Sequence, residues 1–98
     1  MRTVGFQWDQ GNWPKCGKHG VSRAEIEELF RGDFAAYPDL KHADLEERYF
    51  AIGTTSEGRW LFVVFAIRYA GENMMIRPLS ARYMHKKEIE HFEQQKNI

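Results

Sequence analysis

The sequence lacks the features that mark several common classes of protein. Its single cysteine, Cys16, cannot form an internal disulfide, and no charged and apolar signal layout opens the chain; together these predict a reducing, cytoplasmic setting. The longest apolar run, WLFVVFAI at 60–67, is too short to span a membrane. Cys16 has no partner at metal-ligand spacing and no His pair has the spacing of a zinc helix, so we expect no metal site, and there is no glycine-rich phosphate loop.

Net charge is also lacking, but the charges are unevenly placed. Fourteen Lys and Arg balance fourteen Asp and Glu, whereas residues 59–98 hold seven basic against four acidic side chains. The stretch IRPLSARYMHKK at 76–87 has no acid and five basic or histidine side chains: Arg77, Arg82, His85, Lys86 and Lys87. A neutral chain with a basic segment can bind a polyanion locally, with weak long-range attraction.

Apolar sequence is sufficient for one folded domain over residues 1–98, because 43% of the residues are hydrophobic. Ser22 and Glu25 form a capping-box pattern at the start of a helix that Gly32 ends. Residues 31–47 have the pattern of a loop, and Pro78 is expected to end a strand. Hydrophobic periodicity predicts strands at 3–8, 48–54, 59–68 and 74–79, and helices at 22–30 and 85–96.

This order of strand, helix, three-stranded meander and helix predicts an α+β domain. The strand at 59–68 is apolar on both faces, which places it centrally in an antiparallel sheet. A turn at 70–73 would pair Arg68 with Met75 and Ala66 with Arg77, so Arg68 and Arg77 should project from one face. The direction of Arg48 depends on the register of the preceding hairpin.

These residue types suit the cleavage of RNA without a metal. In that reaction the ribose 2′-hydroxyl attacks phosphorus while a base and an acid move protons, and guanidinium groups stabilise the growing phosphate charge. His85 could transfer a proton, and Tyr83 could stack on a base. Structural roles compete with this interpretation: strand-end arginines are commonly solvated, and His85 also occupies the N-cap position of the last helix, with Glu88 three residues later.

Two segments resemble the BrnT family, the toxins of bacterial type II toxin–antitoxin pairs. They are WDQGNWPKCGKHGVSRAEIEELF at 8–30 and a second segment running from ERYFAIGTTSEGRWLFVVFAIR at 47–68 to IRPLSARYMHKKE at 76–88. The motifs follow the family order, from Trp8-Asp9 and the residues 18–22 through Arg48, Gly58-Arg59 and Arg68 to Ser80-Ala81-Arg82.

The resemblance implies a RelE/ParE-like fold and a ribonuclease that arrests growth. It also implies a BrnA-like antitoxin whose DNA-binding domain would hold the pair on operator DNA, with no cofactor and no membrane. Candidate site residues carried over by motif, with His85 added from its chemistry, are Lys18, His19, Arg48, Arg68, Arg77, Arg82 and His85. Lys18 and His19 could instead hold the first helix against the sheet.

Other functions remain open from the sequence. The same fold could act as a non-catalytic co-repressor, or as a ParE-like toxin directed at gyrase, and fold similarity does not decide between them. HGVSRAEIEELF superficially resembles half of a helix-turn-helix, but a proline-containing segment and strands follow where the second helix should be. The cluster of Arg, Lys and His favours RNA chemistry.

Overall fold

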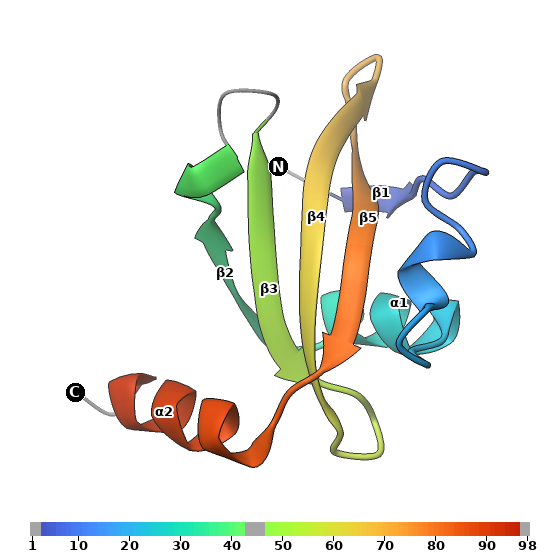
Figure 1. The fold of residues 1–98 in the computed structure, drawn as a ribbon. Coiled ribbons are helices and arrows are strands. Elements are labelled where there is room, and N and C mark those ends of the chain that lie inside the picture. Colours follow the sequence, from blue (N-terminus) through green and yellow to red (C-terminus); the bar gives the residue numbers. More distant parts are fainter. Residues whose placement is uncertain (1–2, 43–46, 97–98) are drawn as a thin grey trace.

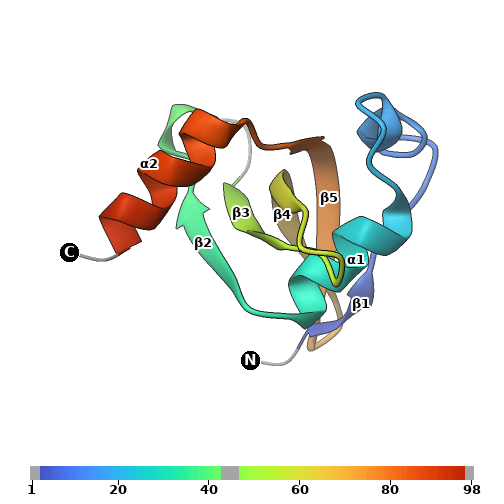
Figure 2. The same ribbon diagram turned by 90° about the horizontal axis from the view of Figure 1, so that it is seen from below.

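The computed structural model describes residues 3–42 and 47–96. These residues form a five-stranded sheet that separates two helices, one on each side (Figures 1 and 2). The elements are β1 (Thr3–Phe6), η1 (Lys15–Gly17, a 3-10 turn), α1 (Arg23–Arg31), β2 (Phe34–Pro38), η2 (Leu40–His42, a 3-10 turn), β3 (Arg48–Thr54), β4 (Trp60–Ala70), β5 (Asn73–Tyr83) and α2 (Lys86–Lys96).

The strand order across the sheet is β1-β5-β4-β3-β2. Strands β2 to β5 are antiparallel to their neighbours, and β4 lies between β3 and β5, which confirms the α+β class, the meander and the central strand. The expectation of a wholly antiparallel sheet is wrong at one edge, where β1 runs parallel to β5. A parallel pair needs a long crossover connection, and the whole chain between β1 and β5 supplies it.

The predicted loop at 31–47 is wrong over residues 34–38, which form β2 and pair with β3 along their full length. Most of β2 is exposed at the edge of the sheet. An edge strand buries little side-chain surface, so FAAYP shows no apolar alternation and its proline suggests a loop. Residues 43–46 of the predicted loop lie outside the described residues.

The third strand of the meander does not end at Pro78, as predicted, but continues to Tyr83. A bulge allows this, because Phe65 pairs with Pro78 whereas Val64 pairs with Ser80, which leaves Leu79 as the extra residue. The carbonyl of Pro78 accepts a hydrogen bond from the buried side chain of Asn12 at 2.8 Å. The loop after β1 is therefore tied to β5 at the bulge.

Helix α1 begins as its sequence predicts. The Ser22 hydroxyl accepts from the Glu25 amide at 3.1 Å, and the Glu25 carboxylate accepts from the Ser22 amide, which completes the capping box. Ile26 and Leu29 are fully buried against the sheet. Helix α2 lies beside the opposite face, where the Phe92 ring contacts Trp60 with ring centroids 5.8 Å apart.

Candidate functional site

Four of the candidate arginines share one face of the sheet. Arg48 pairs with Ala66 and Ala66 with Arg77, so these three positions form one row across β3, β4 and β5. Arg68 is two residues beyond Ala66 and therefore projects from the same side. The core residues of β4 that pack with α1 alternate with these positions. We call the side opposite α1 the arginine face.

The bulge in β5 brings Arg82 to the arginine face as well. Arg77 and Arg82 are five residues apart, so in a regular strand they would project from opposite sides. Because Leu79 is inserted, Arg82 pairs with Phe62, which shares its face with Ala66. The guanidinium of Arg82 lies over the Phe62 ring, 4.7 Å from its centroid. The bulge in β5 thus decides whether Arg82 projects from the same face as the other three arginines.

Arg77 is tightly held by the segment that follows β1. Its guanidinium donates to both Asp9 carboxylate oxygens at 2.8 and 3.1 Å and to the Gln7 side chain at 3.1 Å, and its side chain is only 14% exposed. The hydrogen bond from Arg77, followed by one from the Gly11 amide, lowers the pKa of Asp9. Arg77 therefore fastens the loop after β1 to the arginine face.

Arg82 is paired in the same two-pronged way with the first turn of α2. Its two terminal nitrogens donate to the two Glu88 oxygens, both at 2.8 Å, and the His85 amide donates to Glu88 at 2.9 Å. These contacts hold the pKa of Glu88 at about 2, the Arg82 hydrogen bond contributing most. His85 therefore occupies the N-cap position of α2, which is the structural role considered for it from the sequence. Its side chain is exposed.

Lys18 and His19 are exposed in the loop before α1. The Tyr83 hydroxyl approaches the carbonyl of Gly20, the next residue, at 3.3 Å. The loop that carries these two residues therefore lies beside Tyr83, whereas the four arginines project from the arginine face. Of those arginines, Arg82 is the one next to the end of β5, and Arg48, Arg68 and Arg77 lie further along the sheet.

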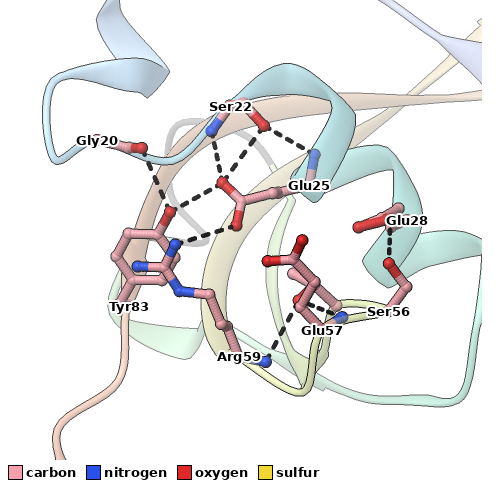
Figure 3. Close-up of polar contacts among 9 residues, drawn as sticks. Gly20, Ser22, Glu25, Glu28, Ser56, Glu57, Arg59 and Tyr83 are labelled. Atoms are coloured by element: carbon pink, nitrogen blue, oxygen red, sulfur yellow. Dashed lines mark hydrogen bonds and ion pairs between the residues drawn. The ribbon is translucent and has the colours of Figure 1, made fainter.

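Tyr83 belongs to a polar cluster whose members come from α1, the β3–β4 hairpin and β5 (Figure 3). Its hydroxyl donates to Glu25 at 2.8 Å, and the guanidinium of Arg59 lies over its ring, 3.7 Å from the centroid. The second oxygen of Glu25 is 3.7 Å from Arg59. We call Glu25, Arg59 and Tyr83 the Tyr83 cluster.

The electrostatics of the Tyr83 cluster favour an ionised carboxylate beside a neutral phenol. Desolvation raises the pKa of Glu25, but hydrogen bonds from Ser22 and Tyr83 outweigh it, and the net result is a lowered pKa. Desolvation and then the Glu25 hydrogen bond raise the pKa of Tyr83. The cluster therefore keeps fixed charges at neutral pH.

Sequence reasoning missed Glu25 and Arg59 as site residues. Glu25 was identified only as the capping-box partner of Ser22, and Arg59 only as part of a Gly-Arg motif. Their contact with Tyr83 joins segments 58 and 24 residues away in the chain, and local patterns give no signal for such a contact. The Gly58-Arg59 motif before a buried strand was the one sequence feature that drew attention to Arg59.

No group of three or more His, Cys, Asp or Glu side chains is arranged to hold a metal ion within residues 3–42 and 47–96. Neither helix in that part of the chain is long and apolar enough to cross a membrane.

A small α+β domain with four arginines on one sheet face is equipped to bind a polyanion. Residues 8–88 match the sequence model of a family described as the ribonuclease toxin, BrnT, of a type II toxin-antitoxin system. Because the match covers most of the chain, the protein belongs to the BrnT family of ribonuclease toxins. Membership implies an RNA target and a protein antitoxin. No curated protein matches the chain at a significant level.

Proposed function

We propose that this chain is a metal-independent RNA endonuclease that inhibits translation and growth. The observation that carries the proposal is the placement of Arg48, Arg68, Arg77 and Arg82 on one face of the sheet. A BrnA-like antitoxin would neutralise the toxin and hold the pair on operator DNA through its own DNA-binding domain. The toxin would act in the cytoplasm.

Phosphate binding is the role of the arginine face in this proposal. Arg82 and Arg77 each hold a carboxylate with two parallel hydrogen bonds, and a guanidinium binds a phosphate with the same fork geometry. An RNA phosphate could replace Glu88 at Arg82, because both partners of that pair are about one-third exposed. Arg68 and Arg77 would extend the phosphate track, with Arg48 assisting.

Cleavage would take place around the end of β5, between Arg82 and the loop that carries Lys18 and His19. The 2′-hydroxyl attacks the adjacent phosphorus and loses its proton to a base, and an acid protonates the departing 5′-oxygen, giving a 2′,3′-cyclic phosphate and a 5′-hydroxyl. His19 and His85 are the proposed proton carriers, one on each side of the strand end. Lys18 would help to neutralise the phosphorane.

The test is cleavage of purified cellular RNA in EDTA, with and without ribosomes. Wild type should cut and leave cyclic phosphate ends. Arg82→Ala should lose at least about tenfold in rate, because one guanidinium contact to the transition state is worth on the order of 2 kcal/mol. The cleavage rates of His19→Ala and His85→Ala show which of the two histidines the reaction requires.

The matched control uses a basic side chain away from the strand end. Lys41→Ala, in η2, should cut as wild type does, with circular dichroism showing that every variant is folded. RNA left intact by folded wild type in both conditions would contradict the proposal. Cleavage that needs added Mg²⁺ would contradict the metal-independent mechanism.

A further inference from the structure

The Tyr83 cluster has a geometry that a merely structural ion pair does not require. The guanidinium carbon of Arg59 lies over the Tyr83 ring, 3.7 Å from its centroid, the closest of the cation–ring contacts in the described residues. Its approach to Glu25, at 3.7 Å, is longer than a hydrogen bond. The guanidinium is therefore oriented mainly by the ring and only secondarily by the carboxylate.

The Tyr83 ring itself is fixed before any ligand arrives. Its hydroxyl is held by the Glu25 carboxylate at 2.8 Å and lies beside the Gly20 carbonyl at 3.3 Å. Glu25 is in turn held by the backbone and hydroxyl of Ser22. Arg59 thus rests on a rigid support, which reduces the entropy that binding would cost.

Arg59 remains accessible to solvent although its guanidinium lies against the Tyr83 ring. Its side chain is 52% exposed, and Figure 3 shows its guanidinium lying across the Tyr83 ring. The Tyr83 ring covers one side of the guanidinium, so a nucleobase would stack on the side away from the ring. An exposed guanidinium plane stacks on the bases of single-stranded RNA.

We propose that Arg59, supported by Tyr83, is a stacking platform for a nucleobase of the RNA substrate. This inference rests on the proposed function, because the ligand is RNA. The platform lies beside the loop that carries Lys18 and His19, next to the end of β5. Sequence alone suggested that Tyr83 would stack on a base; in the structure Arg59 covers one face of that ring, and the base stacks on Arg59.

Binding, measured separately from cleavage, tests the platform. The probes are two fluorescein-labelled single-stranded octanucleotides with 2′-methoxy groups, which prevent cleavage; one carries bases and the other is abasic. Wild type should bind the base-containing probe at least about fivefold more tightly by fluorescence anisotropy, the lower end of the effect of one stacked base. Arg59→Lys keeps the charge but removes the plane, and should abolish that difference.

Two further variants separate stacking from folding. Arg31→Lys is the matched control, since Arg31 is exposed, lies over the Phe6 ring and pairs with Glu27 on α1; it should retain the base-dependent affinity. Tyr83→Phe keeps the ring but loses both hydroxyl contacts, and should weaken the preference only in part. Thermal unfolding checks that each variant is folded.

The outcomes distinguish this inference from the proposed function. Equal base dependence in Arg59→Lys and wild type, or no base dependence in wild type, overturns the platform even if RNA is cut. Base dependence that is lost only in Arg59→Lys supports the platform. If that result accompanies uncut RNA, the platform stands and the nuclease proposal fails.

Discussion

At the scale of single residues, the arginine face contains its own anions. Asp9 and Glu88 each take both terminal nitrogens of an arginine, at 2.8 to 3.1 Å. Two of the proposed phosphate-binding positions are therefore neutralised in the free protein. The Arg82–Glu88 pair is more exposed than the Arg77–Asp9 pair, since the Arg82 side chain is 37% exposed and the Arg77 side chain is 14% exposed. Substrate should displace Glu88 more easily than Asp9.

The Glu88 pair makes a pH-dependent contribution to stability. The pKa of Glu88 is about 2 in the folded protein against 4.5 for an unperturbed glutamate, so between these values the unfolded chain binds the additional proton. Falling pH therefore favours unfolding, and the contribution that is complete above about pH 5 is lost towards pH 2. Thermal unfolding of Glu88→Gln and wild type should differ at pH 7 and converge as the pH falls to about 2.

A double-mutant cycle provides the control for that prediction. In an Arg82→Ala background, Glu88→Gln should have a much smaller effect at pH 7, because the charged partner is already absent. A difference between wild type and Glu88→Gln that stays constant from pH 7 to 2.5 would contradict the assignment of the low pKa to this pair.

At the scale of elements, sequence periodicity correctly predicted the strands and helices that bury an apolar face. Strand β3 has the predicted bounds, and α1 begins with the predicted cap. The errors in the bounds of β2 and β5 fall where regular side-chain alternation gives no signal. Strand β2 is an exposed edge strand, and β5 passes Pro78 through a bulge. The bulge also decides that Arg82 joins Arg77, so the composition of the arginine face could not be predicted from alternation alone.

The start of α1 positions both Glu25 and the loop that carries Lys18 and His19. Ser22→Ala removes the hydroxyl that accepts from the Glu25 amide, and should lower the free energy of unfolding by about 1 kcal/mol. Urea denaturation measures the effect. Ser80→Ala, at an exposed strand position, should change the midpoint little, and equal effects of the two substitutions would contradict a specific role for the cap.

Helix α2 is held to the sheet at two points, the Arg82–Glu88 pair and the ring of Phe92. Phe92 contacts Trp60 and, at 6.5 Å between ring centroids, Tyr37. Phe92→Ala should free the C-terminal turns of α2 at a cost of roughly 1–2 kcal/mol, less than for a fully buried phenylalanine. Hydrogen exchange should rise at 92–96 and stay unchanged in β4.

The exposed Glu90 on the same helix supplies the control, because Glu90→Ala should leave exchange at 92–96 nearly as in wild type. If Phe92→Ala accelerated exchange throughout the sheet, α2 would be part of the main folding unit rather than a separately docked element.

At the scale of the whole molecule, zero net charge must be reconciled with binding to RNA. Residues 59–98 hold seven basic against four acidic side chains, whereas residues 1–58 hold seven against ten. The sheet register places arginines from β3, β4 and β5 on one face. A local track can bind phosphates without a net positive charge, but long-range attraction is weak. The number of phosphates engaged should therefore be small and measurable.

The salt dependence of RNA affinity counts those phosphates. Each contact to single-stranded RNA contributes about −0.7 to the slope of log affinity against log salt. The five proposed cations Lys18, Arg48, Arg68, Arg77 and Arg82 predict a slope of about −3.5, measured by anisotropy on the 2′-methoxy probe. Arg68→Ala should reduce its magnitude by about 0.7, whereas Lys41→Ala should not. A wild-type slope near −1 would mean that RNA contacts only the end of β5, and that Arg48, Arg68 and Arg77 have structural roles.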